Sequence, residues 1–189
     1  MNYIFDIGNV LVSYEPRKYL ERLFTDQTAI EMILHNVYFS DEWQIADEGK
    51  LTRDEMTKIF CDRLPQYKDD VTNLMKNVTD MFKPLDTLKL LPKIKSAGHK
   101  LYYLSNITFD VRDYLVDAYD FFDLFDGGVF SCEERIIKPN PEIYHLLLRR
   151  YNLKAGDCIF FDDMEKNVAA AEKEGIKSVL FTTADCVQF

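Results

Sequence analysis

Tyr3-Ile4-Phe5-Asp6, near the start of this sequence, is a short apolar run that ends in an acid. The same pattern returns as Cys158-Ile159-Phe160-Phe161-Asp162-Asp163, and further apolar runs cover residues 100–104, 128–130 and 178–181. Uninterrupted apolar runs of this length are typical of strands that are buried on both faces of a parallel sheet. Five such runs predict that a sheet forms the centre of the fold.

Helical patterns lie between these runs. Residues 85–97 carry apolar side chains at helical spacing and stop at Gly98, as a helix that ends in a C′ glycine does. Asn140-Pro141-Glu142 is a helix start, with Asn as N-cap and Pro in the first turn. Another helix is predicted over residues 168–174. Strands that alternate with helices predict an α/β fold with a doubly wound, mostly parallel, Rossmann-like sheet.

Residues 15–82 differ from the rest of the chain because they show only helical patterns. Thr52-Arg53-Asp54-Glu55 is a capping box, and apolar residues follow it on one helical face. We therefore predict an α/β core domain of residues 1–14 and 83–189. An all-helical cap domain of residues 15–82 would be inserted after the first strand.

Composition and charge exclude several classes of partner. Of the 189 residues, 47% are hydrophobic and 29% are charged, which is usual for a globular protein and unusual for a disordered one. The net charge of −9 would repel the phosphates of nucleic acids and of anionic membranes, so neither is an expected partner. No secretory signal, disulfide pattern or membrane-spanning run is evident, so we expect a cytoplasmic protein. The oligomeric state stays open.

Polar residues stand at the ends of three predicted strands. Asp6 ends the first, Ser105-Asn106 follow the second, and Asp162-Asp163 end a third. Ligands of an open parallel sheet bind beyond the carboxyl ends of its strands, and Lys138 lies in a loop that can reach the same crevice. Each residue taken singly is explained more simply as a turn, cap or solvated loop residue. Their order and placement together predict a functional site.

Four segments resemble, in order, the motifs of the haloacid dehalogenase (HAD) superfamily. They are Phe5-Asp6-Ile7-Gly8-Asn9-Val10-Leu11, Leu104-Ser105-Asn106, Lys138-Pro139 and Phe161-Asp162-Asp163-Met164-Glu165-Lys166-Asn167. The resemblance covers nearly the whole chain, and the helical insertion is similar to that of the branch with a small helical cap. The first and third segments look closest to bacterial α-D-glucose-1-phosphatase-like phosphatases.

This resemblance implies a magnesium-dependent phosphatase that acts on a small phosphorylated metabolite. The substrate would be a phosphomonoester, with a sugar phosphate as a candidate, and Asp6 would form an aspartyl-phosphate. Asp6 and Lys138 would be the catalytic residues. Ser105, the Asn106 backbone and Lys138 would bind the phosphoryl oxygens of the substrate, since charge stabilisation supplies most of the catalysis in phosphoryl transfer.

The resemblance also implies a set of metal ligands. Mg²⁺ favours oxygen ligands, usually one or two carboxylates together with phosphate and water. Asp6 and Asp163 would bind the ion directly, together with the backbone carbonyl of Gly8. Asp162 would bind it directly or through water.

Gly8 departs from the pattern of the family. Most family phosphatases carry a second Asp at this position, and it acts as general acid/base. Loss of a positioned acid costs about 10²–10⁴-fold in rate. Three explanations stay open, in this order of preference: a substrate with a good leaving group, such as an anomeric sugar phosphate; an acid supplied by the cap or by water; or a low-activity or non-catalytic phospho-ligand-binding protein.

The resemblance leaves one other chemistry to consider, a metal-independent dehalogenase that uses the same Asp nucleophile. Such an enzyme has no use for paired metal-binding carboxylates, so Asp162-Asp163 speaks against it. The candidate substrate contacts are Tyr14, next to the cap, and Trp43 and the turn Asp47-Glu48-Gly49 within it. Packing explains Trp43 more simply, and a solvated helix end explains the acidic turn.

Overall fold

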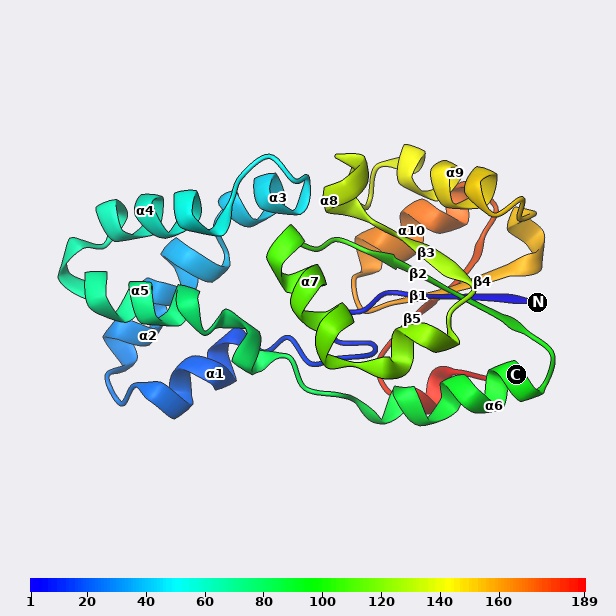
Figure 1. The fold of residues 1–189 in the computed structure, drawn as a ribbon, viewed down its shortest axis with the longest axis horizontal. Helices are drawn as coiled ribbons and strands as arrows, with labels where there is room; N and C mark the ends of the chain where they lie inside the picture. The colour runs from blue at the N-terminus through cyan, green and yellow to red at the C-terminus, as the bar shows by residue number, and fades with distance from the viewer.

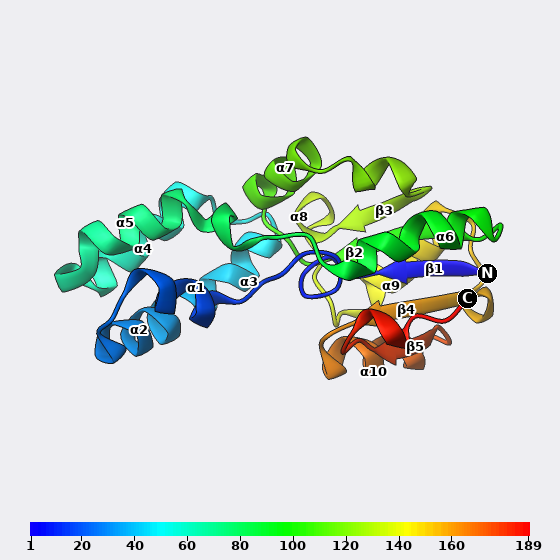
Figure 2. The ribbon, with the colours of Figure 1, turned by 90° about the horizontal axis from the view of Figure 1, so that it is seen from below.

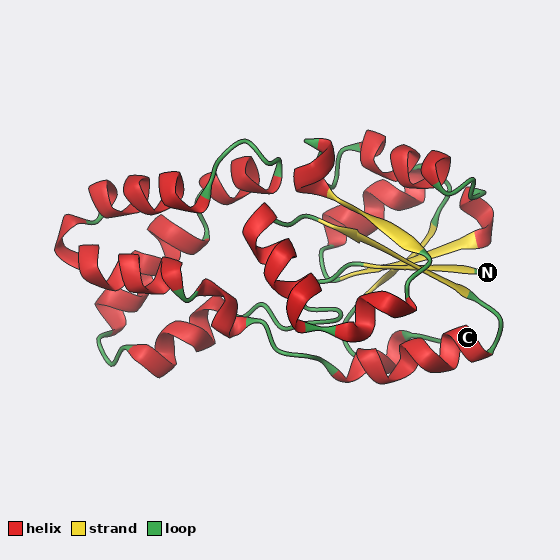
Figure 3. Ribbon diagram, viewed as in Figure 1, coloured by secondary structure: helices red, strands yellow, loops and turns green.

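The computed structural model describes residues 1–189 and contains one five-stranded sheet. Its strands are β1 (Asn2–Phe5), β2 (Lys100–Ser105), β3 (Gly127–Phe130), β4 (Cys158–Asp162) and β5 (Lys177–Leu180). The spatial order is β3-β2-β1-β4-β5, and every neighbouring pair is parallel. All five predicted strands are present, and the α/β fold with a parallel sheet is confirmed (Figure 3).

Helices cover both faces of the sheet. Tyr3 and Phe5 of β1 pack in one apolar cluster with α6 (Leu91–Ser96) and α7 (Phe109–Ala118). Ile4, which points to the opposite face, packs with α9 (Pro141–Arg150) and α10 (Glu165–Lys173). Successive side chains of a strand point to opposite faces, so an unbroken apolar run fits a strand covered on both sides.

The predicted helix over residues 85–97 is divided in two. Asp86–Leu90 forms a 3₁₀-helix, and α6 follows with Pro92 in its first turn. Proline has no N–H to donate, and its ring clashes with the carbonyl four residues before it, so a continuous α-helix through this position is disfavoured. The helix predicted at Asn140 is α9, where the Asn140 side chain accepts a hydrogen bond from the Glu142 backbone at 3.0 Å.

The α-helices of residues 16–76 form one end of the molecule, and residues 42–47 among them reach back to the core (Figures 1 and 2). These helices are α1 (Pro16–Leu23), α2 (Gln27–Ile33), α3 (Glu42–Asp47), α4 (Arg53–Arg63) and α5 (Lys68–Lys76), with a π-helical turn at Leu34–Tyr38. The capping box of α4 is present, since Thr52 Oγ1 accepts from Glu55 N at 3.3 Å and Glu55 Oε2 accepts from Thr52 N at 2.8 Å.

The remaining helical segments are short. They are α8 (Ser131–Glu134) and the 3₁₀-helices Pro65–Tyr67, Val78–Met81, Asp120–Leu124, Ala155–Asp157 and Ala184–Cys186. No helix combines the length and the apolar character that crossing a bilayer requires.

The order of the strands brings the polar strand ends together. β1 lies between β2 and β4, and Phe5 is in register with Tyr103 on one side and Phe161 on the other. Asp6 and Asp162 follow directly at this edge, and Ser105 lies one residue beyond Leu104, which follows Tyr103. The sheet therefore places three of the predicted site residues side by side at its carboxyl edge.

Candidate active site

Lys138 is the centre of the hydrogen-bond network at this edge. Its side chain is 1% exposed, and its Nζ lies 2.9 Å from Asp6 Oδ1 and 2.7 Å from Asp162 Oδ2. Nζ also donates to the carbonyl oxygen of Leu104 at 2.8 Å. An ammonium has three protons, so every donor of this buried group has an acceptor. Two carboxylates from adjacent strands therefore fix Lys138 in place.

The Asn106 side chain fixes the backbone of Lys138. Asn106 Nδ2 donates to Lys138 O at 2.9 Å, and Lys138 N donates to Asn106 Oδ1 at 2.7 Å. Sequence reasoning assigned only the Asn106 backbone, so this positioning contact was missed. Ser105 is buried beside it, and its hydroxyl makes one long contact, 3.5 Å to Asn106 O. That hydroxyl can therefore donate to a ligand.

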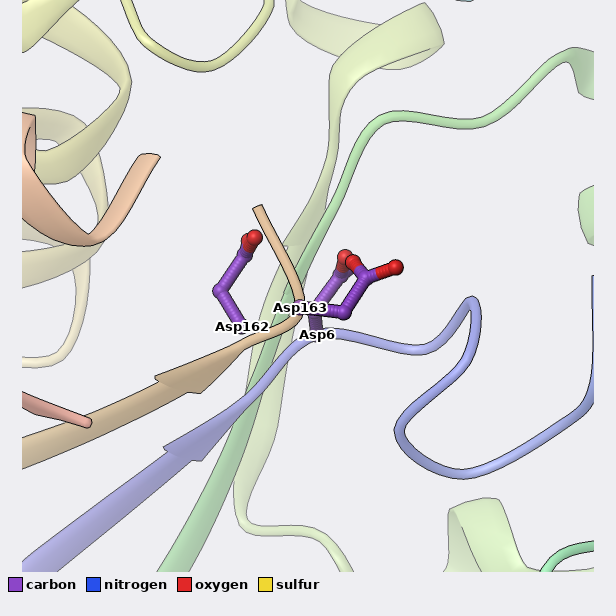
Figure 4. Close-up of side chains that lie close together, drawn as sticks. All are labelled: Asp6, Asp162 and Asp163. Carbon is purple, nitrogen blue, oxygen red and sulfur yellow. The ribbon is translucent and has the colours of Figure 1, made fainter. Parts of the chain in front are cut away.

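Three carboxylates meet beside Lys138. One oxygen from each of Asp6, Asp162 and Asp163 lies within 4.8 Å of the others, at the ends of β1 and β4 (Figure 4). Three carboxylates against one ammonium leave a local excess of negative charge. Hard oxygen donors with such an excess suit a divalent cation such as Mg²⁺.

The two adjacent acids of β4 have different surroundings. Asp162 is fully buried and accepts from Lys138, from Met164 N at 2.8 Å and from Asn167 Nδ2 at 3.0 and 3.1 Å. In Figure 4 its side chain stands apart from those of the other two acids. Asp163 is only half-buried and accepts one side-chain hydrogen bond. Asp163 thus keeps more free lone pairs for an ion than Asp162 does.

Asn9 supplies that one hydrogen bond to Asp163, and sequence reasoning did not assign it a role. Its Nδ2 lies 2.9 Å from Asp163 Oδ2, and its Oδ1 accepts from Tyr14 N at 2.8 Å. The backbone of Asn9 is left-handed, with φ of 53°. Asn tolerates this conformation better than most residues, which is a signal that the sequence does contain. Asn9 ties Asp163 to the loop that leads into the helical end of the molecule.

Burial and charge shift the pKa values of these groups. Burial raises the pKa of Asp6 to about 7, although the ammonium of Lys138 opposes the shift. Burial also raises the pKa of Asp163. Burial alone would lower the pKa of Lys138, but the carboxylates of Asp6 and Asp162 raise it overall, so this side chain stays charged.

A cavity of about 280 Å³ opens above the carboxyl edge. All seven predicted site residues except Asp162 line it, and part of its wall is apolar, formed by Trp43, Phe82, Ile107, Val111 and Leu115. Among the candidate substrate contacts, Tyr14, Trp43 and Asp47 line this cavity, whereas Glu48 and Gly49 do not. Trp43 also packs, since its ring stacks on that of Tyr38, and its Nε1 donates to Val37 O at 2.8 Å.

Asp47 has an environment that its sequence context did not indicate. It ends α3, lines the cavity with Asp6 and is half-buried. Burial, and then the nearby Asp6 carboxylate, raise the pKa of Asp47 to about 8. The three histidines, His35, His99 and His145, lie outside the cavity.

Comparison with known proteins adds to this geometry. The sequence profile of haloacid dehalogenase-like hydrolases matches residues 2–175. A sesquiterpene phosphatase from Aspergillus oryzae is 26% identical over 188 residues, which is 98% of this chain and 92% of the relative.

Solved structures with the same fold include magnesium complexes. A HAD family enzyme from Bacteroides thetaiotaomicron, in complex with magnesium and inorganic phosphate, matches with a TM-score of 0.73 at 20% identity, over 96% of this chain and 94% of that chain. An L-2-haloacid dehalogenase from Xanthobacter autotrophicus, with chloropropionic acid covalently bound, matches with a TM-score of 0.67 at 17% identity, over 94% and 75% of the two chains. At these identities the likeness shows the fold alone.

Proposed function

The chain belongs to the haloacid dehalogenase-like hydrolases, and we propose that it is a magnesium-dependent phosphatase. It would hydrolyse a small phosphomonoester through an aspartyl-phosphate on Asp6. The observation that carries the proposal is the buried ammonium of Lys138, held between Asp6 and Asp162 at the ends of adjacent strands. Such a cation offsets the repulsion between a carboxylate nucleophile and an anionic phosphate.

Two of the similar proteins support phosphate chemistry. The relative that aligns with 98% of this chain is named a sesquiterpene phosphatase. A structure of the same fold holds magnesium together with inorganic phosphate. Both point to phosphoryl transfer as the reaction to test first.

Magnesium fits the donors at the carboxyl edge. Asp6, Asp163 and the Gly8 carbonyl would hold the ion, because the oxygens of Asp162 already accept from Lys138 and from other donors. Asp162 would then act through Lys138 or through water. When bound, the ion polarises the phosphoryl group and neutralises charge that develops on its oxygens.

The side chains and backbone of the protein carry out the nucleophilic attack and bind the phosphoryl group. The Asp6 carboxylate attacks phosphorus and forms the aspartyl-phosphate, which splits one displacement into two. The Ser105 hydroxyl and the Asn106 backbone N–H bind the phosphoryl oxygens, and Lys138 turns the proton that it shares with Asp6 toward them as Asp6 bonds to phosphorus. Asn106 also holds Lys138 through its side chain, so the cation is in place before the substrate arrives.

We also propose that residues 15–82 act as a cap over a core of residues 1–14 and 83–189. Trp43 and Asp47 from the helical end line the cavity above Asp6. Arg53 of α4 forms an ion pair with Asp110 of α7, which joins the two parts beside the cavity. Such a cap excludes water and contacts the leaving group.

The size of the cavity favours a small phosphorylated metabolite as substrate. A volume of about 280 Å³ is small for a ligand pocket, and part of it must hold the phosphoryl group. The apolar part of its wall favours a leaving group that presents carbon to Trp43 and Leu115. The first substrates to assay are therefore apolar alkyl phosphates and sugar phosphates, since a sugar ring also presents one apolar face.

The first prediction concerns the metal. Phosphate release from p-nitrophenyl phosphate, from alkyl phosphates and from glucose 1-phosphate is expected to fall at least about 100-fold when Mg²⁺ is removed with EDTA, because charge on the phosphoryl oxygens then loses its main counter-charge. Activity should return on addition of Mg²⁺. Free phosphate is the quantity to measure, across a titration of the metal.

The same experiment separates the other functions that stay open. Chloride release from 2-chloropropionate without metal, in the absence of phosphate release, would favour the dehalogenase. Binding of inorganic phosphate and Mg²⁺ without turnover of any ester would favour a phospho-ligand-binding protein. Either result would contradict the proposed phosphatase.

The second prediction concerns Gly8. A Cβ at this position would meet no atom within 4 Å, so Gly8→Asp is expected to fold normally. We expect it to change turnover of the otherwise unaltered chain by less than about threefold. An acid at this position does not speed the reaction when the leaving group needs little protonation or when another acid already supplies the proton. The measurement is kcat on both an aryl and an alkyl phosphate. A rise of 100-fold or more, the scale of a newly gained general acid, would show that the missing acid limits this enzyme.

A further inference from the structure

The leaving alcohol of a phosphomonoester needs a proton, and Gly8 cannot give one. We propose that Asp47, at the end of α3 in the cap, is the general acid that protonates the leaving oxygen, and the general base for the second half-reaction. This inference rests on the proposed phosphatase function. It assigns to a cap residue the proton transfer that Gly8, in the segment around Asp6, cannot perform.

The position of Asp47 is the first argument. Asp47 lines the same cavity as Asp6, Gly8 and Lys138, although it lies in a different part of the chain. The carboxyl of Asp47 has no hydrogen-bond or ion-pair partner in the protein. The hydroxyl of Ser131 donates to Asp47, but to its backbone carbonyl. A half-buried carboxyl with no partner is unusual, since burial of an unpaired polar group costs free energy. It is free to contact a ligand in the cavity.

The backbone around Asp47 is held against the core. Ser131 Oγ of α8 donates to Asp47 O at 2.6 Å. Two residues later Gly49, with φ of +67°, brings the turn so close to the Cys132 carbonyl that any Cβ there would clash. These two contacts fix the end of α3 on the core, so the carboxyl of Asp47 keeps its position relative to Asp6. A fixed position is what a general acid requires.

The environment of Asp47 favours its protonated form. Burial and the Asp6 carboxylate raise the pKa of Asp47 to about 8, Asp110 adds to the shift, and the ammonium of Lys138 opposes it. A general acid works best when its pKa lies near the operating pH. Tyr14 lines the same cavity, but burial raises the pKa of its hydroxyl far above the neutral range, so it is a much weaker acid.

The proposed steps balance. A carboxylate oxygen of Asp6 bonds to phosphorus as the bond from phosphorus to the leaving oxygen breaks, and the Asp47 carboxyl gives its proton to that oxygen. The alcohol leaves, and Asp47 is a carboxylate. Water then loses a proton to Asp47 and attacks phosphorus, the bond from Asp6 to phosphorus breaks, and inorganic phosphate departs. Asp6 is a carboxylate again and Asp47 is protonated, as at the start.

The experiment compares leaving groups. Asp47→Asn is expected to lower kcat/KM for n-hexyl phosphate, a poor leaving group, by about 10²–10⁴-fold. The loss for p-nitrophenyl phosphate, whose leaving group needs little protonation, is expected to stay below about tenfold. Glu48→Gln is the matched control, because Glu48 belongs to the same turn, pairs with Lys50 and does not line the cavity. It should leave both rates unchanged.

A rescue variant keeps the test independent of folding. In the double variant Gly8→Asp with Asp47→Asn, the acid at position 8 is expected to restore hexyl phosphate hydrolysis by at least about tenfold over Asp47→Asn alone. Equal losses on both substrates, no loss on either, or no rescue would overturn the role of Asp47 while leaving the phosphatase intact. No turnover by the unaltered chain would overturn both proposals together.

Discussion

Asp6→Asn is expected to lower kcat for every phosphomonoester by at least about 10⁴-fold, the scale on which removal of one member of a catalytic unit acts. The amide nitrogen that replaces one carboxylate oxygen cannot form the phosphoryl ester, and the remaining amide oxygen is a poor nucleophile. The fold should survive the change. Lys138 keeps Asp162 as a partner at 2.7 Å, and a carboxylate whose pKa is raised by burial is replaced by a neutral group.

The measurement for Asp6 has two parts. Phosphate release gives the loss of turnover, and acid quenching followed by mass spectrometry of the intact protein detects the aspartyl-phosphate in the unaltered chain alone. Asp62→Asn is the matched control, because Asp62 is an exposed acid of α4 that pairs with Lys58. A phosphorylated Asp6→Asn protein, or turnover close to normal, would place the nucleophile elsewhere.

The strand ends could be predicted from the sequence because two local signals coincide there. Unbroken apolar runs at residues 3–5 and 158–161 require burial on both faces, and a parallel sheet brings the residues after them to one edge. The neighbourhood of Asp6, Ser105 and Asp162 follows from that geometry. The presence of Lys138 between two of these acids needed the resemblance to a family, since its loop has no local signal of burial.

The sequence marks Asp47 as a candidate substrate contact but not as the proposed general acid, for a physical reason. An acid followed by Glu48 and Gly49 is what a solvated helix end looks like, and the burial that raises the pKa of Asp47 exists only in the folded protein. The side-chain role of Asn106 was hidden in the same way, because it depends on a contact with a loop 32 residues away. Contacts between residues far apart in the chain produce no local pattern of spacing or hydrophobicity from which the sequence could predict them.

Lys138→Met is expected to lower stability as well as catalysis. The thioether fills most of the space of the lysine stem but brings no charge, so Asp162, which is fully buried, loses its cation. Removal of one member of a buried ion pair costs about 3–5 kcal/mol in free energy of unfolding, because the other charge stays buried and unpaired. Loss of a donor to the phosphoryl oxygens should lower kcat by about 10²–10³-fold as well.

A double variant separates the two effects. Lys138→Met combined with Asp162→Asn removes the unpaired carboxylate, so the free energy of unfolding is expected to recover part of the loss, while kcat stays as low as in Lys138→Met. Urea unfolding with EDTA present gives the first quantity without any contribution from metal, and phosphate release with Mg²⁺ gives the second. If activity recovered together with stability, Lys138 would only hold Asp162 in place, and the proposed contact of its ammonium with the phosphoryl group would be wrong. If instead Lys138→Met were as stable as the unaltered chain, the buried carboxylates would have to be neutral in the folded protein, and the charge balance that favours a divalent cation at this edge would no longer hold.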